Sequence, residues 1–191
     1  MSLLAALRRY AAHGNPITAA GNTVALVVGG NGPFYPLYLW FIEPEAATPA
    51  LLTMLASPFF LAIPWLSRRS TFAAALALPL VGMANTVFTT ALLGAQTGAS
   101  LFLLPCLILA ALLWQHRLAL LGMLGLGLLV QQALLRWPWP PLAGLTETQQ
   151  ASLQLLNASS VGTLLAFLAL VLSGLAQSSA GAMPAKGVAR S

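Results

Sequence analysis

The sequence FAAALALPLVGMANTVFTTALL, at positions 72–93, decides the class of this protein. It contains no charged side chain, and a helix of about 20 mostly apolar residues crosses the roughly 30 Å hydrocarbon core of a bilayer. Other segments of the chain are comparably apolar. We therefore expect an all-α, polytopic integral membrane protein with six transmembrane helices, at 17–40, 49–66, 72–93, 99–115, 118–135 and 154–176.

The composition of the whole chain agrees with this expectation. Of the 191 residues, 59% are apolar and 6% are charged, whereas a soluble domain is about 45–50% apolar and about 25% charged. Because a water-facing surface is built largely from charged groups, the composition excludes a soluble enzyme, a nucleic-acid-binding domain and a disordered chain. The single cysteine, Cys106, lies in an apolar segment, so no intrachain disulfide is possible.

The placement of the charges predicts the orientation of the chain. With six spans and a cytoplasmic N-terminus, seven of the eight Lys and Arg residues fall on the cytoplasmic side, which is the positive-inside pattern. We therefore expect both termini in the cytoplasm. The predicted cytoplasmic cations are Arg8, Arg9, Arg68, Arg69, Arg117, Lys186 and Arg190, and the predicted outer charges are Arg136, Glu43, Glu45 and Glu147.

The chain divides into three predicted regions. They are an amphipathic N-terminal interfacial segment at 1–16, a six-helix transmembrane bundle at 17–176 and a flexible cytoplasmic tail at 177–191. In the outer loop before the last span, Thr146 followed by Gln149 has the spacing of a capping box, which favours a helix start at that point.

Ionisable residues are absent from the middle of every predicted span. Such residues mark proton relays and ion pathways, and paired carboxylates carry general acid–base catalysis. We therefore expect neither a proton-coupled transporter nor an enzyme. The two histidines, His13 and His116, are predicted at the cytoplasmic interface beside arginines, so we expect no haem, metal or other cofactor.

The segment GGNGPFYP at 29–36 is the strongest local irregularity. Three glycines and two prolines disfavour a regular helix, so either the first span ends here or its helix is broken near the outer leaflet. One interpretation is an outer-interface turn with a belt of aromatic rings. The other is an external ligand site, because a broken helix exposes backbone groups that bind solutes. For that site the sequence predicts Asn31, Tyr35, Tyr38 and Trp40.

Uncharged polar residues in the third span add to this candidate site. Asn85 and Thr89 are four residues apart and therefore share one face of a helix. Hydrogen bonds between helices are the structural interpretation, and a polar lining for a small neutral ligand or a quinone-like head group is the functional one. We include both residues among the predicted ligand-binding residues.

Three short motifs carry a resemblance to a known family. They are NTVF at 85–88, LGAQTG at 93–98 and LFLLP at 101–105. This pattern resembles the six-helix membrane modules of bacterial adenylate and diguanylate cyclases, in which a helix ends in a glycine-containing outer turn and the next begins with an aromatic-rich run that reaches a proline. The resemblance implies a sensor or anchor module in the bacterial inner (cytoplasmic) membrane. Since only residues 177–191 follow the last predicted span, we expect no cyclase chemistry in this chain.

Two functions from different classes are open at this point. The first is a non-enzymatic integral membrane module that senses a ligand or acts as a helical subunit or anchor of a membrane complex. The alternative is a small transporter or channel for a neutral or lipophilic solute, acting as a dimer. The expected partners are the lipid bilayer and either a second copy of the chain or another membrane protein, and no nucleic acid.

Overall fold

The computed structural model describes residues 2–114, 116–136 and 144–181, and these ranges contain helices and no strand. The expected all-α fold is confirmed. In chain order the elements are α1 (Leu3–Ala11), α2 (Pro16–Asn31), α3 (Phe34–Ile42), α4 (Pro44–Ala50), η1 (Leu51–Ala56), α5 (Ser57–Arg69), α6 (Thr71–Leu93), η2 (Ala95–Thr97), η3 (Ala99–Phe102), α7 (Leu103–Leu113), α8 (Arg117–Arg136) and α9 (Glu147–Gly181).

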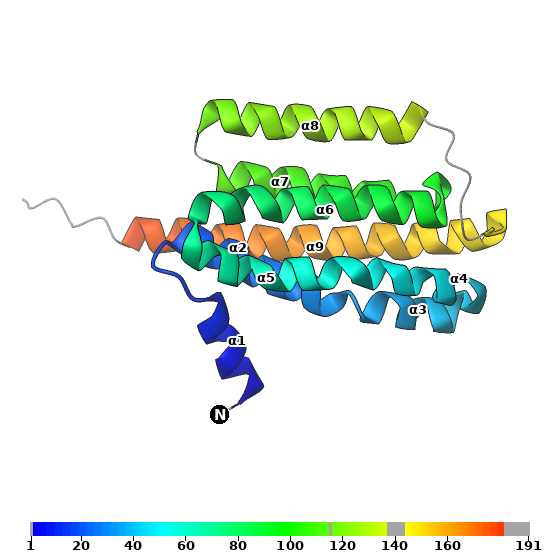
Figure 1. Ribbon diagram of the computed structural model, residues 1–191, viewed down its shortest axis with the longest axis horizontal. Helices are drawn as coiled ribbons and strands as arrows, with labels where there is room; N and C mark the ends of the chain where they lie inside the picture. Colours follow the sequence, from blue (N-terminus) through cyan, green and yellow to red (C-terminus); the bar gives the residue numbers. More distant parts are fainter. Residues whose placement is uncertain (1, 115, 137–143, 182–191) are drawn as a thin grey trace, which may run out of the picture.

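The helices from α2 to α9 lie lengthwise beside one another, while α1 projects sideways from one end (Figure 1). Four helical segments are long and apolar enough to cross a membrane: Pro44–Arg69, Thr71–Leu93, Arg117–Arg136 and Glu147–Gln177. The chain is therefore a multi-pass membrane protein by the length and composition of its helices. The first and fourth predicted spans do not reach this length as single helices, so six crossings stay a prediction.

The first predicted span is divided between α2 and α3. The intervening Gly32 and Pro33 keep right-handed helical backbone angles, with φ and ψ of −49° and −47° for Gly32 and −64° and −23° for Pro33. The backbone amide of Tyr35 donates to the carbonyl of Gly32 at 3.3 Å. Of the two outcomes left open by the sequence, the structure therefore has the broken helix, and α3 continues α2 along the bundle (Figure 1).

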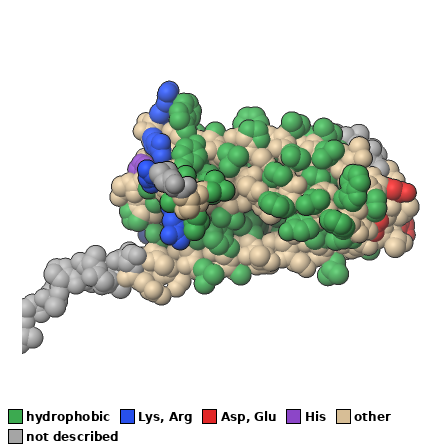
Figure 2. Space-filling view, turned by 90° about the horizontal axis from the view of Figure 1, so that it is seen from below, with side chains coloured by type: hydrophobic (Ala, Val, Ile, Leu, Met, Phe, Trp, Pro, Cys, Tyr) green, Lys and Arg blue, Asp and Glu red, His purple; other side chains and the backbone are tan. Residues whose placement is uncertain are grey.

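Charged side chains gather at the two ends of the bundle, with hydrophobic side chains between them (Figure 2). The basic end carries the arginines of α1 and the two arginines at the end of α5. The acidic end carries the three glutamates. Helix α9 runs from the acidic end to the basic end, so its last residues lie at the same end as α1 (Figure 1). This charge segregation is what a positive-inside arrangement requires.

Helix α1 is attached to the bundle through its last turn. The hydroxyl of Tyr10 donates to the carbonyl of Leu61 at 2.9 Å, and the guanidinium of Arg68 donates to the carbonyl of Tyr10 at 3.2 Å. The leucines of α1 stay exposed, at 77%, 58% and 40% for Leu3, Leu4 and Leu7. An interfacial helix needs this combination, because its apolar face must be free to enter the lipid surface.

Helix α9 corrects two predicted boundaries. It begins at Glu147, seven residues before the predicted sixth span at 154–176, and it continues to Gly181, into the segment predicted as a flexible tail. Its start is the predicted capping box: the Thr146 amide donates to Gln149 Oε1 at 2.9 Å, and the Gln149 amide donates to Thr146 Oγ1 at 3.3 Å. Two amides at the helix start are thereby paired, so the helix begins among polar residues, before its apolar part.

Candidate functional site

A cavity of about 650 Å³ lies among α2, α3, α6, α7 and α9, and we call it the central cavity. This volume is within the usual range for small-molecule sites. None of the described residues that line it is charged. Its polar lining residues are Asn31, Tyr35, Tyr38, Thr53, Asn85, Thr86, Thr89, Ser159, Ser160 and Thr163.

Five of the six residues predicted to bind a ligand line the central cavity. Trp40 is the sixth; it is 66% exposed and does not line the cavity. A role for Trp40 in an external site stays a prediction, and helix period explains why this residue lies away from the cavity. Tyr35 and Tyr38 are three residues apart and share the inner face of α3, whereas a position two residues later falls on another face.

Two residues of the lining each carry a buried side-chain atom that has no hydrogen-bond partner among the described residues. These atoms are the hydroxyl of Tyr35 and Oδ1 of Asn85. Behind Tyr35 lies Asn157, which donates through Nδ2 to the carbonyl of Thr97 at 2.8 Å. Asn157 lies near the Tyr35 hydroxyl, but the geometry of a hydrogen bond is not met, and Asn157 Oδ1 also lacks a partner. A buried polar atom without a partner costs about 1–3 kcal/mol, so an occupant that bonds to these atoms would be stabilised.

The hydroxyl groups of Thr86 and Ser160 donate within their own helices and are left to accept hydrogen bonds from a ligand. Thr86 Oγ1 donates to the Gly82 carbonyl at 2.9 Å, and Ser160 Oγ donates to the Leu156 carbonyl at 2.8 Å. Because these protons are bonded within their own helices, only the oxygen lone pairs face a ligand. Asn85 Oδ1 is an acceptor as well, and the Tyr35 hydroxyl supplies a donor. The lining therefore suits a head group that has both a donor and an acceptor.

Apolar side chains form the rest of the wall. They include Phe60, Leu109 and Phe167. Cys106, which is 6% exposed, also lines the cavity. Among the lining residues, Val27, Phe34 and Tyr38 on one side are 45%, 50% and 48% exposed. On the other side, Ser159 and Thr163 of α9 are also exposed. The cavity therefore opens sideways between α2–α3 and α9, toward the surface that lipid would cover.

The ligand-binding residues predicted from the sequence include none from α9. Ser159, Ser160 and Thr163 lie within one and a half turns of that helix and all line the cavity. Their spacing of one and four residues was a usable signal, because it places three hydroxyl side chains near one face. No group of three or more potential metal-ligating His, Cys, Asp or Glu side chains occurs within the described residues.

No protein family, curated protein or solved structure matches this chain. The resemblance to cyclase membrane modules stays a prediction.

Proposed function

We propose that this protein is a non-enzymatic membrane module that senses a lipophilic molecule with an uncharged polar head, bound in the central cavity. The observation that carries the proposal is the pairing of a largely apolar cavity with two buried, unpartnered polar atoms, Tyr35 OH and Asn85 Oδ1. A binding site of this kind needs a few convergent polar groups in an apolar wall to fix the orientation of the ligand.

The neutral lining sets the charge of the ligand. An ionised head group loses its hydration on entering an apolar cavity, and only an opposite charge or several strong hydrogen bonds compensate that loss. The cavity lining contains no such charge. A hydroxyl or amide head is suited instead, since it donates to Asn85 Oδ1 and accepts from the Tyr35 hydroxyl. The sideways opening supports entry of such a ligand from the lipid phase.

A photo-crosslinking experiment on the full chain in lipid nanodiscs tests the proposal. The probe is dodecanol with a diazirine in its alkyl chain, and the crosslinked residues are identified by mass spectrometry. We expect crosslinks to α6, α7 and α9, and we expect free dodecanol to compete for them. Dodecane, which lacks the head group, and dodecanoate, which is charged, should compete at least tenfold less well.

Two variants distinguish binding at a specific site from nonspecific binding to an apolar surface. Tyr35→Phe removes one hydroxyl and should weaken dodecanol competition about fivefold, the value of one neutral hydrogen bond. Tyr10→Phe removes a hydroxyl that bonds to Leu61 at the basic end and should leave competition unchanged. Equal competition by dodecanol and dodecane, or equal effects of the two variants, would contradict the proposed site.

One observation favours the alternative, carriage of a neutral or lipophilic solute. Leu78, which is 1% exposed, lines both the central cavity and a smaller pocket at the basic end. Leu78 is the one described residue that the two linings share. Glycerol permeability of vesicles containing the protein distinguishes the two functions: a sensor leaves it at the value of protein-free vesicles, and a carrier or channel raises it.

A further inference from the structure

The basic end carries positive charge that no acidic side chain balances. Arg8 and Arg9 stand in the last turn of α1, Arg68 and Arg69 in the last turn of α5, and Arg117 begins α8 at the same end (Figure 1). All five are exposed. The chain has three acidic side chains, and all of them lie at the acidic end (Figure 2). This separation of charge favours an anionic partner at the basic end.

Side chains of α2 and α5 hold the last turn of α1. The backbone carbonyls of a last helical turn have no partner within the helix itself. Here the guanidinium of Arg68 donates to the carbonyls of Tyr10 at 3.2 Å and Arg9 at 3.5 Å. Asn22 Nδ2 donates to the carbonyl of Ala11 at 3.0 Å. These bonds fix the direction in which α1 leaves the bundle.

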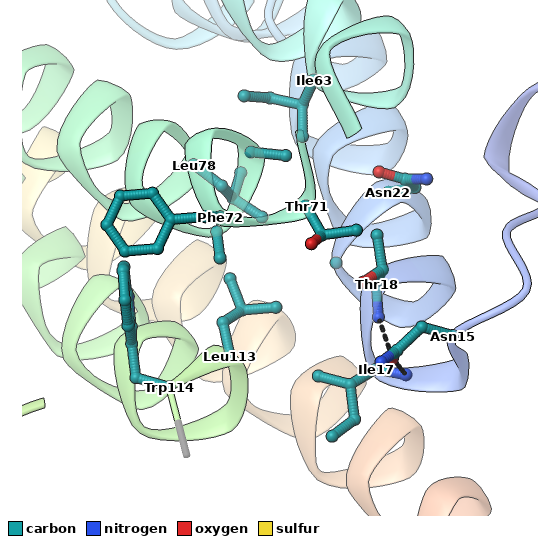
Figure 3. Close-up of a pocket in the computed structure, with 13 residues that line it drawn as sticks. Asn15, Ile17, Thr18, Asn22, Ile63, Thr71, Phe72, Leu78, Leu113 and Trp114 are labelled. Carbon is teal, nitrogen blue, oxygen red and sulfur yellow. Dashed lines mark hydrogen bonds between the residues drawn. The ribbon is translucent and has the colours of Figure 1, made fainter. Parts of the chain in front are cut away.

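The short connection between α1 and α2 is held in the same way. The side-chain oxygen of Asn15 caps α2, because it accepts from the backbone amides of Ile17 and Thr18 at 2.9 and 3.1 Å (Figure 3). The amide of Asn15 itself donates to His13 Nδ1 at 3.0 Å. Helix α1 is therefore a preformed arm that lies across the long axis of the bundle (Figure 1). A preformed surface loses less conformational entropy when it binds a partner.

Helix α1 has an apolar face and a basic face. Leu3 and Leu7 are one helical turn apart and share a face with Leu4, and all three are exposed. Arg9 comes two residues after Leu7 and therefore falls on the opposite face. Because the spans cross the bilayer along the long axis of the bundle, α1 lies in the plane of the bilayer surface. In that position leucines enter the acyl region while arginines stay among the head groups.

The end of α5 adds further groups at head-group level. The guanidinium of Arg69 lies over the ring of Trp65 at 4.2 Å, and both residues are exposed. A tryptophan ring of this kind prefers the membrane–water interface. The bonds of Arg68 to α1 use only Nη2, so its other guanidinium nitrogens keep N–H groups for an external acceptor. Guanidinium groups bind phosphate oxygens through paired N–H groups.

We infer that α1 and the end of α5 form a binding surface for phospholipids whose head group carries a net negative charge. Phosphate oxygens accept from the guanidinium groups of Arg8 and Arg69, and acyl chains lie against Leu3 and Leu7. A zwitterionic phospholipid also has a phosphate, but the arginines repel its head-group cation. The exposed leucines beside the arginines favour a lipid surface over a nucleic acid or an acidic protein. None of these residues lines the central cavity, so the inference goes beyond the function proposed for it.

Native mass spectrometry of the full chain in dodecyl maltoside micelles tests this inference. The probes are phosphatidylglycerol, which is anionic, and phosphatidylcholine with identical acyl chains, which is zwitterionic. We expect the first phosphatidylglycerol to bind about fivefold more tightly at about 50 mM ammonium acetate. The preference should shrink at about 500 mM, because salt screens exposed charges. Equal affinities of the two lipids at the lower salt concentration would overturn the inference.

Charge variants locate the binding. Arg8→Gln and Arg69→Gln each remove one cation and leave the bonds of Arg68 to α1 in place, so each should weaken phosphatidylglycerol binding about fivefold. Arg136→Gln removes the same charge from the last residue of α8, at the acidic end, and is the matched control. It should leave the affinity unchanged. Equal losses in all three variants would show a general attraction between charges and would contradict a surface at the basic end.

A leucine variant distinguishes a lipid from other anions. Leu3→Ser removes an exposed apolar side chain of α1 and should weaken phosphatidylglycerol binding several-fold, because the acyl chains lose a contact. Leu155→Ser in α9 is the control, since Leu155 is 73% exposed against 77% for Leu3 and lies outside the surface. Glycerol phosphate and a hexaglutamate peptide are the competing anions. If either binds as tightly as phosphatidylglycerol and Leu3→Ser has no effect, the surface recognises a free anion or an acidic protein, and the inference fails.

Discussion

Helices α6 and α8 are both long and apolar, but they occupy different environments. In the most apolar window of α6, 44% of the residues are buried inside the protein, against 17% for α8. Helix α6 contributes to every apolar cluster along the bundle, whereas α8 packs at one side against α6 and α7 (Figure 1). Apolarity therefore predicts that a helix crosses the membrane and says nothing about whether it faces protein or lipid.

Polar residues distinguish the two helices. Along α6, Thr86, Thr89 and Thr90 are all buried, and Asn85 is partly buried beside them. In α8 the two glutamines, Gln131 and Gln132, lie in the last turns, and Gln132 is exposed. A polar side chain in mid-membrane is tolerated where protein or a cavity surrounds it. Uncharged polar residues in the middle of a span are therefore the better guide to the interior of this bundle.

The largest expected difference between the helices comes from removing a leucine. Leu78→Ala in α6 removes a side chain that is 1% exposed, so the free energy of unfolding should fall by about 2–5 kcal/mol. Leu128→Ala in α8 removes one that is 60% exposed, and a change within about 0.5 kcal/mol is expected because lipid refills the space. Unfolding in mixed detergent micelles measures both. Similar losses would show that α8 has a protein partner in place of lipid.

Glycines give the next difference. A Cβ added at Gly82 of α6 would lie 2.6 Å from Sγ of Cys106, whereas one added at Gly125 of α8 would meet nothing within 4 Å. Gly82→Ala should therefore destabilise the protein by about 1–3 kcal/mol, and Gly125→Ala should be neutral or stabilise it by up to about 1 kcal/mol.

A double variant verifies the cause of the Gly82 effect. Cys106→Ala removes the sulfur atom that the new methyl group would meet. The double variant Gly82→Ala/Cys106→Ala should therefore lose less free energy of unfolding than the sum of the losses in the two single variants. Additive behaviour would mean that the close approach of α6 and α7 at this point is not what Gly82 provides.

Much of the fold was predictable, and the errors have identifiable physical causes. The helical segments followed from apolar runs, and the Gly32–Pro33 step indicated an irregularity without deciding whether the first span ends there or is broken. The length of α9 did not follow in this way, because Glu147 and its neighbours are polar, and hydropathy detects the lipid-embedded part of a helix only. The capping box at Thr146 was the correct signal for that start.

The candidate site was predictable only residue by residue. Asn31, Tyr35, Tyr38, Asn85 and Thr89 line one cavity, but the sequence assigned the first three to an external surface and left the last two in a separate helix. Which helices adjoin is a tertiary fact, since α3 and α6 are separated by almost thirty residues of chain. The smaller pocket at the basic end depends on the same kind of fact, because Asn22 of α2 and Trp114, which follows α7, both line it and are distant in sequence.

The smallest stability effect is expected where the functional effect is largest. Asn85 Oδ1 has no partner in the described structure, so Asn85→Leu removes no hydrogen bond made through that atom. Its effect on unfolding should stay within the roughly 0.6 kcal/mol typical of one polar contact between membrane helices. Gln132→Leu on the exposed face of α8 should change stability as little. If Asn85 serves a ligand, however, only Asn85→Leu should abolish competition by dodecanol in the crosslinking assay. A large loss of stability in Asn85→Leu, with competition intact, would assign this residue to the structure of the bundle and would leave α6 and α8 different in burial alone.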